Sequence, residues 1–113
     1  MKILIAAASL VLVQQIQQTA TIQPGKIEEA CMVMAAGERL EFSFSANIGM
    51  DFNIHYHDEE KVHFPVQESS LSAWKGVYIA PHKQQYCLMW TNKHATEPAS
   101  LRYAYALYRM QAE

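Results

Sequence analysis

The stretch Leu40-Glu41-Phe42-Ser43-Phe44-Ser45 places an apolar side chain at every second position. Successive side chains of a β-strand point to opposite faces, so this stretch has one apolar face and one polar face. A helix would instead need apolar residues three and four positions apart. The stretch therefore predicts a β-strand that is buried on one side.

The same alternation recurs in four runs further along the chain. These runs cover residues 52–56, 62–66, 86–90 and 101–105. Polar or turn-forming segments separate the runs, at residues 36–38, 58–61, 67–70, 81–84 and 92–98. Many short strands without an amphipathic helix are typical of a sandwich or barrel, and Pro65 favours an edge position for its strand.

We therefore predict an all-β fold, a small antiparallel β-sandwich of jelly-roll type. The apolar positions of the alternating runs should form its core. The core residues we expect are Phe42, Phe44, Phe52, Ile54, Leu88 and Trp90. The same alternation places Val62, Phe64 and Val66 on the core side of their strand.

The start of the chain has the layout of a secretory signal peptide. Lys2 precedes an uncharged, mostly apolar run over residues 3–13, which is too short to span a bilayer. A polar run follows, and Ala20 suits the last position before a cleavage site. We predict a signal peptide over 1–20 and one domain over 21–113, which is 113 − 20 = 93 residues. The alternative is a buried first strand or helix of a cytosolic protein.

The chain contains two cysteines, Cys31 and Cys87. In an exported domain of this size they favour a disulfide, because a small core gains much from a covalent link. Two alternatives stay open: a pair of buried free thiols, or thiolates that bind Cu(I) together with methionines. The methionines nearest to the two cysteines in the sequence are Met32, Met34 and Met89.

The order of landmarks resembles the GOLD (Golgi dynamics) domain family over about residues 28–106. Acidic residues precede Cys31, an alternating strand runs over 39–44, and residues 85–92 bring Cys87, Trp90 and Asn92. The resemblance is closest to the lumenal domains of cargo receptors of the early secretory pathway. It implies a β-sandwich used as a binding module, with one cysteine near its start and one in a late strand. Those receptors continue into a coiled coil and a transmembrane helix, and we expect neither in this sequence.

Three histidines predict a metal site. If the runs 52–56 and 62–66 pair as a hairpin with their core positions matched, then His55, His57 and His63 share the outer face. Neutral imidazoles at that spacing bind Zn(II) or Cu(II). The alternatives are a solvated polar face that is rich in histidine, or a pH-sensitive surface.

Composition narrows the function further. A formal net charge of −2 argues against a nucleic-acid partner, which calls for clustered Lys and Arg. We find no second apolar run long enough for a membrane anchor, and no nucleophile elbow, paired-carboxylate site or phosphate loop. We predict an exported, non-catalytic module, periplasmic or secreted, that binds a protein or peptide. The alternative is a periplasmic protein that binds copper or zinc through the histidine cluster.

Overall fold

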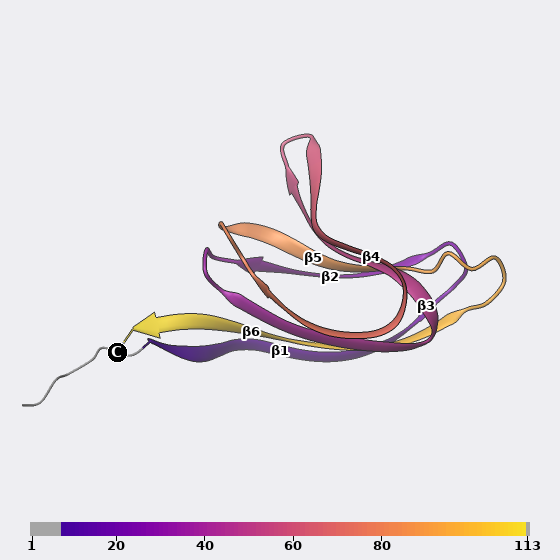
Figure 1. Cartoon of the computed structure of the whole chain (residues 1–113), viewed down its shortest axis with the longest axis horizontal. Helices are drawn as coiled ribbons and strands as arrows, with labels where there is room; N and C mark the ends of the chain where they lie inside the picture. Colours follow the sequence, from indigo (N-terminus) through magenta and orange to yellow (C-terminus); the bar gives the residue numbers. More distant parts are fainter. Residues whose placement is uncertain (1–7, 113) are drawn as a thin grey trace, which may run out of the picture.

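The computed structural model describes residues 8–112, and within this range every element is a β-strand (Figure 1). The strands are β1 (Ala8–Ile22), β2 (Ile27–Met34), β3 (Arg39–Asp58), β4 (Lys61–Ile79), β5 (Gln84–Thr91) and β6 (Ala99–Ala112). All the pairings between them are antiparallel. The described residues contain no helix that could cross a membrane.

The strands form one sheet that curls over on itself. Its order is β1-β6-β3-β5-β2, and β4 pairs along the other side of β3. The first part of β3 pairs with β6, from Arg39 to Ala46, and a later part pairs with β5, from Asp51 to His55. Because one long strand belongs to both halves, the two halves of the sheet face each other as two layers (Figure 1).

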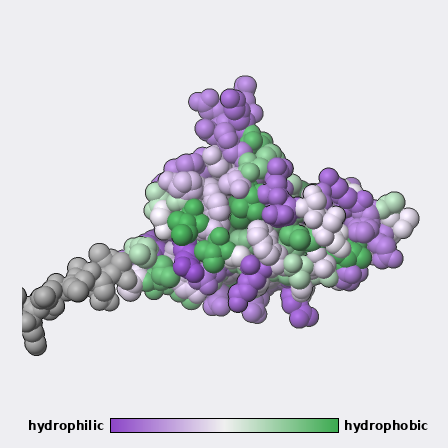
Figure 2. Space-filling model, in the orientation of Figure 1, coloured by the Kyte–Doolittle hydropathy of each residue, from purple (hydrophilic) through white to green (hydrophobic). Residues whose placement is uncertain are grey.

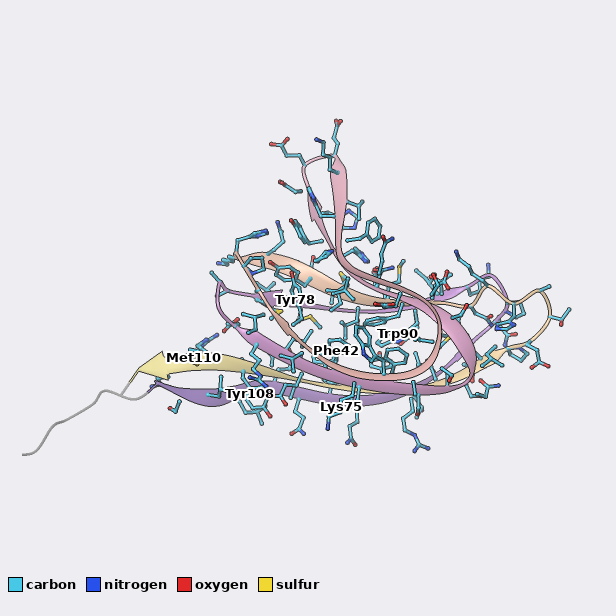
Figure 3. All side chains as sticks on the ribbon, in the orientation of Figure 1. Phe42, Lys75, Tyr78, Trp90, Tyr108 and Met110 are labelled. Atoms are coloured by element: carbon cyan, nitrogen blue, oxygen red, sulfur yellow. A yellow bond between two sulfur atoms is a disulfide. The ribbon has the colours of Figure 1, made fainter. Side chains whose placement is uncertain are left out.

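An aromatic core fills the space between the layers. Figure 3 shows Phe42 and Trp90 pointing into it from opposite sides. Phe52 is 1% exposed, and its ring lies within 6 Å of four other aromatic rings. All six residues that alternation assigned to the core are buried. The predicted all-β antiparallel class is therefore confirmed, and so is the Cys31–Cys87 disulfide.

Two local predictions are wrong. Residues 67–70 were expected to separate two strands, but they lie inside β4, where Ser70 adopts a positive φ of 57° and the ladder with β3 is irregular. Val62 and Phe64 were expected in the core, yet they are 42% and 43% exposed. The ladder shifts by one residue between Ile54 and Tyr56, opposite Pro65, and this shift turns Val62 and Phe64 outward.

Residues 8–20, which the sequence assigns to a signal peptide, form most of β1. This strand pairs with β6 from Ala8 to Ile22. Among the side chains of residues 9–22, only that of Ile22 belongs to the buried core, and Ile22 lies beyond Ala20. Whether export removes residues 1–20 stays a prediction.

Candidate functional site

The connection between β3 and β4 projects from the body of the molecule. We call residues 55–66 the projecting hairpin, and Figure 1 shows it rising away from both layers. Asp58 pairs with Lys61, so Glu59 and Glu60 form a two-residue turn at its end. Figure 2 shows that the end of this projection is hydrophilic. The turn therefore presents a cluster of carboxylates at the most prominent point of this face.

The turn holds a residue in an unfavourable backbone conformation. Glu59 has a φ of +55°, in the left-handed region that favours glycine. For a residue with a Cβ this conformation costs about 1–2 kcal/mol. Strain of this kind gathers at functional sites, so an observed outlier supports a functional hypothesis. Glu59 is therefore the first residue of the hairpin to test.

The base of the projecting hairpin is built around a buried histidine. The side chain of His55 is 5% exposed. Its Nδ1 lies 2.7 Å from Asn53 Oδ1, and its Nε2 lies 3.2 Å from Glu29 Oε2. The rings of His57 and Phe64 pack against it, with centroids 5.4 and 5.8 Å away. Burial lowers the pKa of His55, the Glu29 carboxylate opposes this effect, and His57 adds to it.

The disulfide lies next to this base, on the outer face of the sheet. Cys87 pairs with His55 across β3 and β5, and Cys31 pairs with Cys87 across β2 and β5. The covalent link therefore ties β2 to β5, and β5 is the strand that pairs with β3 at the start of the hairpin. The hairpin thus projects from a part of the sheet in which two neighbouring strands are covalently linked.

The structure brings together two of the three predicted metal ligands. His55 and His57 are adjacent on the outer face, but His63 lies opposite Tyr56 and stacks on its ring, with centroids 4.8 Å apart. The prediction that His63 shares their face is wrong. The cause of this error is the register shift at Pro65, which adds one residue to β4. Every β4 side chain between Pro65 and the turn therefore lies on the face opposite to the one expected.

Another set of metal-ligating side chains lies close together in the described part of the chain. It consists of Glu29, Cys31 and Cys87. Both sulfur atoms are in the disulfide, so they do not provide the thiolates that metals prefer. Binding of copper or zinc by His55, His57 and His63 stays a prediction, and calorimetric titration with Cu(II) and Zn(II) tests it.

The hairpin also carries an apolar surface that sequence reasoning missed. Val62 and Phe64 are exposed on its outer side, next to the acidic turn. Pro65 was the one signal in the sequence, because a proline interrupts a ladder and accompanies bulges. An exposed aromatic ring with polar groups at its rim is a combination that suits protein contacts.

A concave surface lies on the outer face of the layer that contains β1 and β6. It is a broad hollow of about 760 Å³ lined by residues of β1, β3 and β6. The outward-facing residues are Gln17, Thr19, Ser43, Ser45, Arg102 and Ala104. Most of these side chains are small and polar, so the hollow is a shallow trough.

Acid should destabilise the fold through two buried groups. His55 has a pKa below its ordinary 6.5, so its stabilising effect is complete above that pH and is lost as the pH falls through the folded-state pKa. Burial acts to raise the pKa of Glu38, but the Ala35 amide and Arg109 outweigh it and hold the pKa below 4.5. The free energy of unfolding, measured with urea between pH 8 and pH 4, should therefore fall below about pH 6.5 and again below 4.5.

A substitution separates the two contributions. His55→Gln should flatten the upper part of this pH dependence and leave the lower part, which depends on Glu38. An unchanged slope just below pH 6.5 in the variant would contradict the assignment to His55.

Comparison with known proteins places the fold. No protein-family model matches the chain, and no curated protein matches its sequence. Among solved structures, the chain is similar to the crystal structure of Aeromonas hydrophila PliG, a periplasmic lysozyme inhibitor of g-type lysozyme. The TM-score is 0.64 at 12% sequence identity, and the match covers 82% of this chain and 85% of that chain. The likeness shows a shared fold.

The resemblance to the GOLD family is wrong. The fold is similar to that of PliG, and no family model supports the GOLD assignment. The resemblance depended on alternating strands and on one cysteine in an early and one in a late strand. These features follow from antiparallel pairing of β2 with β5, which many β-proteins share, so they indicate a fold class and not a family.

Proposed function

We propose that this protein is an exported, non-catalytic inhibitor that binds a g-type lysozyme. The observation that carries the proposal is the fold it shares with PliG over most of both chains. A fold alone does not define a function, so the site must supply the rest of the argument. The projecting hairpin supplies it, because a protrusion is suited to enter a concave site on another protein.

The hairpin has the properties of a preorganised contact surface. Its base is held by the disulfide and by the contacts of His55 with Asn53 and Glu29. Little conformational freedom is then lost on binding, which favours affinity. Phe64 offers an exposed aromatic ring, and the carboxylates of the turn can pair with cationic groups or accept hydrogen bonds. Inhibition of this kind needs occupation of a cleft and no chemical step.

A binding titration tests the proposal. Calorimetry of the disulfide-intact protein with a purified g-type lysozyme should show a saturable complex with a stoichiometry of one to one. A lysozyme of another type serves as the control for specificity. Absence of heat and of a complex at concentrations of tens of micromolar would contradict the proposal.

We predict that Glu59→Gly separates stability from binding. Glycine adopts a φ of +55° without the steric cost of a Cβ, so the free energy of unfolding should rise by about 0.5–1 kcal/mol. The loss of the carboxylate should weaken lysozyme binding by about tenfold or more. Urea denaturation and calorimetry measure the two effects on the same samples.

Two variants serve as controls for Glu59→Gly. Glu59→Gln keeps the strained Cβ but removes the charge, so it should weaken binding without the gain in stability. Glu68→Gln removes an exposed carboxylate from β4 outside the hairpin and should change neither property. Equal binding by the protein and both Glu59 variants would exclude the turn from the interface.

Export to the periplasm is part of the proposal, in line with the signal-like start of the chain. Intact mass of protein recovered from the native compartment gives the position of any cleavage. A mature chain that begins at Thr21 would support removal of residues 1–20, at the cost of most of β1.

A further inference from the structure

β1 has a free edge along its whole length. It is the last strand in the sheet order, and on its other side it pairs with β6 from Ala8 to Ile22. No other strand pairs with its outer edge within residues 8–112. Alternate backbone N–H and C=O groups along this edge are therefore free to pair with another strand.

The other two free edges of the sheet are protected. β2 is eight residues long and carries Glu28 and Glu29. β4 carries several charged residues, Pro65 at a register shift, and Ser70 with a positive φ. Short length, charges, prolines and bulges are the devices by which proteins prevent edge-to-edge association. The sheet therefore protects two of its edges in the usual way.

β1 has few of these devices. Its fifteen residues include no charged residue and no proline, and its one irregularity is the register shift between Leu12 and Gln14. A strand of this length without charges or prolines is suited to pair with another strand. The edge of β1 therefore differs from the other two edges of the same sheet.

One end of β1 also exposes apolar side chains on both of its faces. Leu10, Val11, Leu12 and Val13 are between 39% and 48% exposed, and Met110 of β6 is 55% exposed. We call these five residues the apolar end, and Figure 3 shows Met110 on the part of β6 that extends beyond the two layers. A two-stranded ribbon has little stability alone, so a further strand would benefit this region most.

We propose that the edge of β1 pairs with β1 of a second copy, antiparallel and about a two-fold axis at Val11. This register places Leu10 of one copy opposite Leu12 of the other, and Val11 opposite itself. It brings the two apolar ends together and joins the two sheets into one. A second copy fits better than a charged partner strand. Two uncharged β1 edges meet without repulsion, whereas a charged strand would find no opposite charge on β1.

The proposal is independent of lysozyme binding, because the projecting hairpin belongs to β3 and β4. It requires that residues 8–20 remain on the mature chain. It therefore competes with cleavage at Ala20, and the mass of the mature protein distinguishes the two. A mature chain beginning at Thr21 overturns the β1 dimer.

Sedimentation equilibrium of the full chain tests the oligomeric state. We expect a mass of about twice 12.9 kDa at micromolar concentrations. Val11→Lys places two like charges opposite each other across the axis and should raise the dissociation constant by about tenfold or more. Val77→Lys is the matched control, because Val77 is an exposed valine on the protected edge strand β4, and this variant should stay dimeric.

A charge exchange tests the position of the axis. Val11→Lys and Val11→Glu should each be monomeric alone, and a mixture of the two should form a heterodimer, because the opposite charges then face each other. Near-ultraviolet circular dichroism of the core tryptophans verifies that both variants are folded. The proposal would be overturned by a parent protein that stays monomeric at about 100 µM. It would also be overturned by dimers that persist in both Val11 variants.

Discussion

Phe52→Ala should lower the free energy of unfolding by about 3–5 kcal/mol, which is a large share of the 5–15 kcal/mol that stabilises a typical domain. Phe52 is 1% exposed, and its ring lies 4.9 Å from the ring of Phe44 and 5.4 Å from that of Trp90. Truncation removes the ring at the middle of the core. The cavity that remains is enclosed by side chains from both layers, which the disulfide and the strand pairings prevent from closing in fully.

Urea denaturation followed by tryptophan fluorescence measures this effect. Phe64→Ala is the matched control, because it is the same truncation at a side chain 43% exposed, and it should cost less than about 1 kcal/mol. Equal costs for the two variants would show that the core has been placed on the wrong face of β3.

The double variant Cys31→Ala/Cys87→Ala should be less stable than the parent by about 2–5 kcal/mol. The two cysteines are 56 residues apart in sequence, so the disulfide closes a long loop and restricts the unfolded chain. Cys31 is exposed, and Cys87 is buried but lies outside the core cluster between the layers, so the substitutions remove little of the core packing. The loss of stability should therefore come mainly from the greater freedom of the unfolded state.

Reduction of the parent protein provides an independent measurement. Dithiothreitol should destabilise the parent by a similar amount and leave the double variant unchanged. If the reduced parent were as stable as the oxidised protein, the disulfide would have no part in holding the base of the projecting hairpin.

The core was predictable from sequence because alternation reports directly which side of a strand is buried. Phe42, Phe44 and Phe52 lie on regular stretches of β3, so their faces follow from counting by two. Counting failed at Pro65. One extra residue in β4 reverses the face of Val62, His63 and Phe64, and no periodic pattern marks where such a shift occurs.

The candidate site was predictable only in part, for the same reason. His55 and His57 are two residues apart on one strand, so their shared face needed no knowledge of pairing. The position of His63 depended on the register between two strands, and the prediction was wrong. The contact of His55 with Glu29 could not be predicted from the sequence, because the pairing of β2 with β5 and of β5 with β3 brings Glu29 to it over a long range.

β1 illustrates how one segment can satisfy two patterns. An uncharged run of small and branched residues suits the apolar region of a signal peptide, and it suits an edge strand equally well. The alternative of a buried first strand was open at the sequence level, and the pairing with β6 shows that residues 8–22 have a place in the sheet. Only Ile22 of this strand is buried with the core.

Inhibition of cell-wall lysis is the most direct test of the central claim. The rate at which a g-type lysozyme clears a suspension of bacterial cell walls should fall as the disulfide-intact protein is added, with complete inhibition near one equivalent. Glu59→Gln should shift the inhibition to about tenfold higher concentrations or more. An unchanged rate of lysis in the presence of excess folded protein would contradict the account.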